Sequence, residues 1–148
     1  KALGYTGISS KSCKVVWRSL INLARCSAWN AALPEPRYFM SAEDLTTLAG
    51  ACVQQDLALV SAMGLTHVER NGHHFVDGFA GRPKAEAVRF MEAHPDLYAD
   101  TPLGPRLAIR DGMLDLGSVV SAKGLGAAIE PDTTAMDRMP KAAWPPGG

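Results

Sequence analysis

The sequence predicts an α/β fold in which short parallel strands alternate with helices. Three short segments have the β-branched and aromatic content of strands, and two spans between them carry apolar residues at helical spacing. Strands separated by a connection of helical length pair in parallel, through right-handed crossovers. The chain has 148 residues, 47% of them hydrophobic and 20% charged, which is typical of a compact globular domain with its own core.

The first strand is expected at residues 4–9, where glycine, tyrosine, threonine and isoleucine alternate in a short run. A helix is expected to follow at about residues 12–29, with Ser10 or Ser12 as its N-cap. Residues 33–36 include two prolines, so the helix cannot continue through them.

The second strand is expected at residues 38–40, and a second helix follows it directly and runs to Met63. Ser41 as N-cap and Asp44 at position N3 resemble a capping box at the start of that helix. Gly64 then supplies the position after the helix, where a left-handed backbone is favoured.

The third strand is expected at residues 65–69, directly after that glycine. Beyond it the pattern changes to a short helix, a hairpin and an arm. Asp111-Gly112 predicts the hairpin turn, because both central residues of a type I′ turn need a positive φ. These elements are expected at residues 83–94 for the helix, 106–110 and 113–116 for the hairpin strands, and 123–132 for the glycine-bearing arm.

Composition excludes several classes of partner. Fifteen basic and fifteen acidic residues leave no net charge, so neither nucleic acid nor an anionic membrane surface is indicated. The apolar runs are too short to span a membrane. The three cysteines, Cys13, Cys26 and Cys52, have no metal-binding spacing, and we expect buried, reduced thiols in a cytoplasmic protein.

Polar residues follow all three predicted strands, and they are expected to meet at one edge of the sheet, where parallel α/β proteins carry their chemistry. Lys11 could act as a base, or be an ordinary solvated lysine. Glu69 could act as a general acid, or form a simple ion pair with Arg70. Glu43 and Asp44 fit helix capping better than catalysis.

The segment after the third strand adds Asn71, His73 and His74. Neighbouring residues of an extended chain point to opposite sides, so one histidine at most faces a site. No zinc-type ligand spacing surrounds the pair, and a substrate contact is the better interpretation for His73 and Asn71. Asp44 is a third candidate for substrate binding.

Taken in order, these motifs resemble the C-terminal part of enolase-superfamily proteins of the mandelate racemase and muconate lactonizing enzyme group. Residues 109–113, Ile-Arg-Asp-Gly-Met, and residues 124–132, Gly-Leu-Gly-Ala-Ala-Ile-Glu-Pro-Asp, are similar to the closing segment of that family. Residues 40–45 and 66–70 are similar to its last two barrel strands. The resemblance covers most of the chain, from about residue 9 to 132.

The resemblance implies a (β/α)7β barrel, of which this chain would supply the last three β/α units, at residues 1–80. Residues 81–132 would return as helix, hairpin and arm toward a capping domain, and residues 133–148 would be a loose tail. It also implies Mg²⁺ and proton abstraction α to a carboxylate, giving an enediolate. Lys11 matches the family's lysine on the sixth strand, and Glu69 its glutamate after the last strand.

The resemblance also sets limits. No histidine stands at residues 41–44, where mandelate racemase has a base, so a two-base racemase mechanism is not indicated. The carboxylates that bind Mg²⁺ belong to earlier strands, so no metal ligand is expected in this segment. The implied partners are a small-molecule carboxylate substrate and further copies of the intact protein in a homo-oligomer.

Two functions of different class therefore compete. The first is a segment of a Mg²⁺-dependent lyase or isomerase that dehydrates or racemises a hydroxy acid or acid sugar. The second is a non-catalytic or small-ligand-binding α/β domain with an open sheet.

Overall fold

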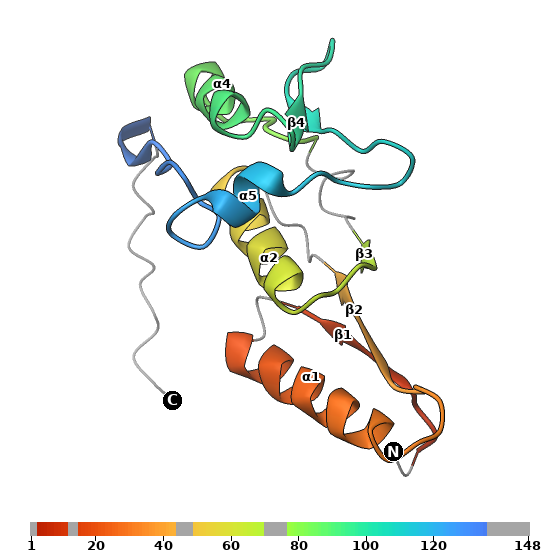
Figure 1. Ribbon diagram of the computed structural model, residues 1–148. Coiled ribbons are helices and arrows are strands. Elements are labelled where there is room, and N and C mark those ends of the chain that lie inside the picture. The colour runs from red at the N-terminus through yellow and green to blue at the C-terminus, as the bar shows by residue number, and fades with distance from the viewer. Residues whose placement is uncertain (1–2, 12–14, 44–48, 70–76, 136–148) are drawn as a thin grey trace, which may run out of the picture.

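The computed structural model of the chain describes residues 3–11, 15–43, 49–69 and 77–135 (Figure 1). No helix among them is both long and apolar enough to cross a membrane. The elements are β1 (Gly7–Ser10), α1 (Val16–Asn30), β2 (Phe39–Glu43), α2 (Ala51–Ala62), β3 (Val68–Glu69), α4 (Lys84–Ala93), β4 (Tyr98–Ala99), β5 (Arg106–Leu107), α5 (Gly117–Ser121) and the 3-10 helix η2 (Thr133–Ala135).

The first three strands form one parallel sheet in the order β1-β2-β3, which confirms the predicted α/β class. Ser10 lies opposite Ala42 in the first pair, and Ala42 lies opposite Val68 in the second. Helices α1 and α2 make the two connections. A connection that contains a helix returns the chain to the same end of the sheet, so all three strands run in one direction.

Helix α1 is attached to β1 and β2 at two places (Figure 1). The hydroxyls of Ser10 and Ser19 share a buried hydrogen bond of 2.7 Å. At the other end, Asn30 Oδ1 accepts hydrogen bonds from the backbone N–H groups of Arg37 and Tyr38, and Asn30 Nδ2 donates to the Tyr38 carbonyl. The side chain of Asn30 therefore closes the loop from α1 to β2.

The predicted start of the second helix is wrong. Ser41 lies in β2, opposite Ser9, and α2 begins ten residues later at Ala51. Met40 and Ala42 are buried whereas Ser41 and Glu43 are partly exposed, so the period of two continues to the end of the strand. The capping role of Ser10 is also wrong, because this residue lies in β1 and no side chain caps α1.

The predicted end of the second helix is confirmed. Gly64 has a φ of 67°, and its N–H donates to the Ser61 carbonyl at 2.9 Å. The N–H of Leu65 donates to the Val60 carbonyl at 3.1 Å. These two bonds make a Schellman motif, which turns the chain directly from α2 toward β3.

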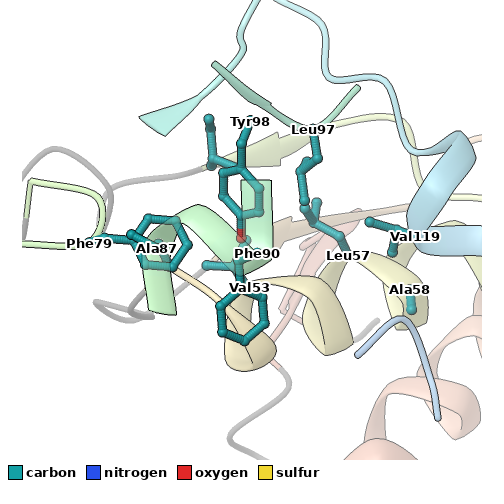
Figure 2. Packing of buried hydrophobic residues seen from close by; sticks show 11 residues of the cluster. Val53, Leu57, Ala58, Phe79, Ala87, Phe90, Leu97, Tyr98 and Val119 are labelled. Atoms are coloured by element: carbon teal, nitrogen blue, oxygen red, sulfur yellow. The ribbon is translucent and has the colours of Figure 1, made fainter. Parts of the chain in front are cut away.

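The hydrophobic core lies around α2 and the C-terminal elements, on the far side of α2 from α1 (Figures 1 and 2). Phe79 contacts both Phe90 and Tyr98, with ring centroids 5.8 and 5.2 Å apart. Val53 and Leu57 of α2 are almost fully buried within the same cluster. Its members are Ala49, Val53, Leu57, Ala58, Phe79, Ala87, Phe90, Leu97, Tyr98, Leu107 and Val119.

The predicted hairpin is present only at its turn. Asp111 and Gly112 both have positive φ, 50° and 74°, and Arg110 and Met113 form an isolated antiparallel bridge across them. The flanking residues do not form the expected pair of strands. Instead β5 pairs antiparallel with β4, which places Leu107 in the core opposite Tyr98.

The glycine-bearing arm packs against α2 and α5. Gly126 is buried with a φ of 80°. A Cβ atom there would lie 2.9 Å from the Gln54 carbonyl oxygen and 2.9 Å from Val119 Cγ1. Only glycine fits so close to the helix backbone.

Gly126→Ala is expected to destabilise the chain by about 1–3 kcal/mol more than Gly124→Ala. Both positions have a positive φ, but a Cβ at Gly124 would meet only Ala127 Cβ, at 3.9 Å. The difference in the free energy of unfolding between the two variants therefore measures overpacking separately from backbone strain. Urea unfolding measures it, and equal losses of stability would contradict the packing argument.

Self-association is expected because β1 and β3 have no further strand beside them among the described residues. Light scattering should show a mean mass that rises with concentration. Ile8→Lys, on the edge strand, should reduce this association, whereas Leu103→Lys, at an exposed apolar residue outside the sheet, should leave it unchanged. A monomer at every concentration, with a sharp thermal transition, would contradict the expectation.

Candidate functional site

Three charged residues stand in a row at the carboxyl end of the parallel sheet. Glu43 and Glu69 are the last residues of β2 and β3 and lie opposite each other in the register. Lys11 follows the last residue of β1, and because Ser10 lies opposite Ala42, Lys11 is in line with Glu43. The expected convergence of these three residues at one sheet edge is therefore observed.

Lys11 and Glu43 form an ion pair at the carboxyl end of the sheet. Their side chains are 30% and 23% exposed, so the pair is less screened by water than an ion pair on an open surface. Glu69 is exposed. Like charges directly opposite each other on neighbouring strands are destabilising, and the ammonium group of Lys11 offsets part of the repulsion between Glu43 and Glu69.

The pairing of the strands sets the spacing of the row. Lys11 and Glu69 are separated by two strand spacings, about 10 Å between backbones. Both side chains are long and flexible enough to approach a group held between them, above Glu43. The arrangement can thus present a cationic nitrogen and a carboxyl group to the same small anionic ligand.

The remaining candidate residues, Asp44, Asn71, His73 and His74, lie outside the described residues, and their roles stay predictions. Within the described ranges, no three histidine, cysteine, aspartate or glutamate side chains gather in a way that could hold a metal ion.

Glu43 is the residue that the sequence interpretation assigned wrongly. Its proposed role in capping the second helix fails, because α2 begins eight residues after it. A signal was available in the sequence: apolar Met40 and Ala42 alternate with polar Ser41 and Glu43, which is the pattern of a strand. Extending the strand by that pattern would have placed Glu43 beside Lys11.

A second polar cluster joins α4 to α5. Ser118 donates hydrogen bonds to Asp96 from its hydroxyl and from its backbone N–H, the latter at 2.7 Å. His94 Nδ1 lies 2.9 Å from the same hydroxyl. Because the hydroxyl has one proton and gives it to Asp96, His94 Nδ1 must be the donor in the other bond.

This order of residues does not activate a nucleophile. In a hydrolytic triad the imidazole stands between the carboxylate and the hydroxyl, and takes the hydroxyl proton. Here the hydroxyl of Ser118 stands between His94 and Asp96. The cluster is therefore structural and fixes the start of α5 against the end of α4.

Burial controls the ionisation of this cluster. His94 is 0% exposed, and burial lowers the pKa of its imidazole, although a hydrogen bond with the Ala127 backbone and the charge of Asp96 oppose the change. Burial pushes the pKa of Asp96 upward, but the hydrogen bonds from Ser118 and from backbone N–H groups outweigh it and lower this pKa.

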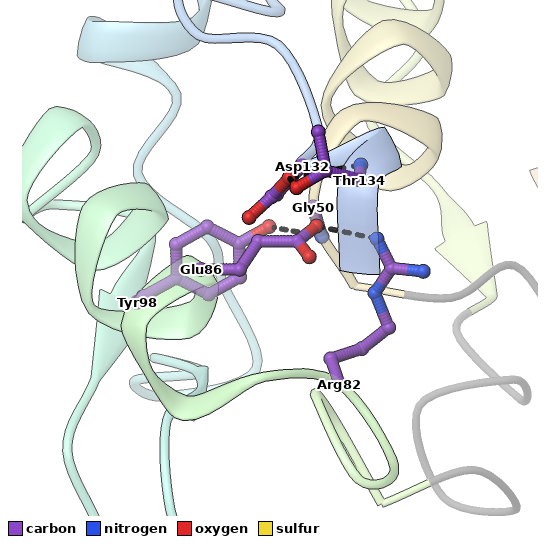
Figure 3. A network of polar contacts seen from close by, with 6 residues as sticks. All are labelled: Gly50, Arg82, Glu86, Tyr98, Asp132 and Thr134. Carbon is purple, nitrogen blue, oxygen red and sulfur yellow. Dashed lines mark hydrogen bonds and ion pairs between the residues drawn. The ribbon is translucent and has the colours of Figure 1, made fainter. Parts of the chain in front are cut away.

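A third group of polar contacts ties the start of α2 to the C-terminal elements (Figure 3). The N–H of Gly50 donates to the hydroxyl oxygen of Tyr98 at 3.0 Å. Burial raises the pKa of that hydroxyl, so it stays protonated. Arg82 and the buried Glu86 form an ion pair of 2.5 Å one turn apart at the start of α4. These contacts are structural.

Of the two cysteines that the structure describes, one is buried and one is exposed. Cys26 is buried, and burial raises the pKa of its thiol, which keeps it protonated and unreactive. Cys52 is exposed, which corrects the expectation that the thiols are buried. Cys13 lies outside the described residues.

The chain is expected to lose stability as pH falls below about 6.5, the ordinary value for histidine in the unfolded state. The folded state holds His94 neutral, so the unfolded state binds the extra proton, at a cost of up to about 1.4 kcal/mol per pH unit. His94→Asn should flatten this dependence in urea unfolding between pH 7.5 and 5.5. His67→Asn, at an exposed histidine, should retain it. A steeper loss in His94→Asn would contradict the assignment.

Comparison with protein-family models, with curated proteins and with solved structures finds no match for this chain. Its functional interpretation therefore depends on its own geometry, and above all on the row of Lys11, Glu43 and Glu69 at the ends of three parallel strands.

Proposed function

We propose that this chain is the C-terminal barrel segment of a Mg²⁺-dependent lyase or isomerase of the enolase superfamily, acting on a small-molecule carboxylate. The observation that carries the proposal is the position of Lys11 and Glu69, at the carboxyl ends of parallel strands on either side of Glu43. Chemistry in parallel barrels is placed at that end. The sequence resemblance of residues 109–113 and 124–132 to the closing segment of that family supports the same assignment.

The barrel itself is part of the proposal. Three parallel strands joined by helices are compatible with the last three β/α units of a (β/α)7β barrel. In that architecture, strands of the same protein would pair with the outer edges of β1 and β3. Closure of this kind removes the exposed edges that the described sheet leaves open.

The proposed reaction is removal of a proton from the carbon next to a carboxylate. Lys11, in its neutral form, would take the proton on Nζ, and the electron pair left on carbon would move into the carboxylate to give an enediolate. Glu69, in its protonated form, would donate a hydrogen bond to the developing oxyanion.

Magnesium would stabilise the charge of the enediolate when bound. The described residues do not fit such a site, because no group of three ligating side chains gathers among them and Glu43 is engaged by Lys11. We therefore place the Mg²⁺ ligands outside this segment and assign no step to the metal here.

In the protein that carries the whole barrel, Lys11→Ala should abolish exchange of the α-hydrogen with deuterated solvent. Glu69→Gln should lower turnover by about 10²–10³, and more than it weakens binding, because its hydrogen bond strengthens as charge develops. ¹H NMR of gluconate and mandelate in D₂O, with Mg²⁺ present, measures the exchange. Glu35→Gln, an exposed glutamate in the loop before β2, is the matched control.

Undiminished exchange in Lys11→Ala would mean that another residue is the base. A loss of turnover below about tenfold in Glu69→Gln would count against the role of Glu69 as hydrogen-bond donor to the oxyanion. Binding of these acids without exchange in the unmodified protein would favour the alternative, a small-ligand-binding α/β domain with an open sheet.

A further inference from the structure

Glu43 occupies the middle of the row of charged residues, and the proposed reaction leaves it without a role. It ends the central strand of the sheet, opposite Glu69 on one side and in line with Lys11 on the other. Any molecule that touches both Lys11 and Glu69 must pass over it. Its ion pair with Lys11 links it directly to the proposed base.

We infer that Glu43 is a positioning residue, whose carboxylate holds the ammonium group of Lys11 at the carboxyl end of β1 until substrate arrives. This inference rests on the proposed function, because it assigns Glu43 through its effect on Lys11.

The geometry supports an ion pair that keeps the side-chain nitrogen of Lys11 in one position, rather than a loose surface contact. Lysine has four rotatable bonds and loses much side-chain freedom when it is fixed. A carboxylate at the end of the neighbouring strand is itself fixed by the ladder between β1 and β2, and both side chains are largely shielded from water. Displacement of a reacting group by about 1 Å can cost about 10²-fold in rate.

The other charged groups around Lys11 do not supply the same contact. Arg18 of α1 lines a small cavity of about 280 Å³ together with Lys11, but it is a cation. Glu69 lies one strand further away than Glu43. Among the described residues, Glu43 is the acidic group paired with Lys11.

The first test uses the chain itself and needs no activity. ¹³C NMR of lysine side chains should show that Glu43→Gln moves the Lys11 Cε signal, because the carboxylate that pairs with the Lys11 nitrogen is removed. The Lys84 signal should not change, and Glu35→Gln should leave both signals unchanged. Glu43→Asp should restore part of the Lys11 behaviour.

The second test uses the protein with the whole barrel and the exchange of gluconate or mandelate hydrogen in D₂O. Glu43→Gln should lower kcat by about tenfold to a hundredfold with a smaller change in KM. Glu43→Asp should recover part of the rate, whereas a purely structural role would not lower kcat selectively.

The outcomes separate the two proposals. If Lys11→Ala abolishes exchange but Glu43→Gln behaves like Glu35→Gln in both experiments, Glu43 has no positioning role and the proposed function stands. If Lys11→Ala leaves exchange intact, the proposed function fails. In that case a moved Lys11 Cε signal in Glu43→Gln would still establish the ion pair, but not a catalytic purpose for it.

Discussion

The arrangement of the helices and strands depends on the nearly complete burial of α2. Its residues from Val53 to Val60 are buried with one exception, so this helix contacts protein on almost every side. Val53 and Leu57 pack among the aromatic side chains of α4 and β4, and Gly126 of the arm lies against the backbone of the same helix (Figure 2). A helix that is buried on almost every side belongs in an interior, and the C-terminal elements supply that interior, although α2 also buries the polar side chains of Gln54 and Asp56.

The position of α2 determines where the third strand can begin. The Schellman motif at Gly64 ends the helix sharply, and β3 follows four residues later beside β2. The parallel register then sets Glu69 opposite Glu43, and the register of β1 sets Lys11 in line with both. The row of charged residues is therefore a consequence of helix packing and strand pairing, since residues far apart in the chain reach one edge.

Local sequence signals predicted some elements of the fold correctly and others wrongly. Parallel pairing follows from the helical connections between the strands. The end of α2 follows from a glycine that accepts a positive φ. The start of α2 was missed because Ser41 and Asp44 have the spacing of a capping box, and this signal competed with the period of two through Glu43. The β4–β5 pair and the contact of His94 with Ser118 join residues that no local sequence pattern connects. These contacts therefore could not be predicted from the sequence and are known only from the structure.

The candidate site and the core occupy different parts of the molecule. Lys11, Glu43 and Glu69 lie at the edge of a small sheet that contributes none of its residues to the main hydrophobic cluster. Packing around α2 carries most of the apolar burial, so substitutions of partly exposed side chains at the strand ends remove little buried surface. The carboxyl end of the sheet can hold two carboxylates opposite each other because the ammonium group of Lys11 pairs with Glu43 and offsets part of their repulsion. In the cluster of His94, Ser118 and Asp96 the single carboxylate is stabilised differently, by hydrogen bonds that the hydroxyl and the backbone N–H of Ser118 donate to Asp96.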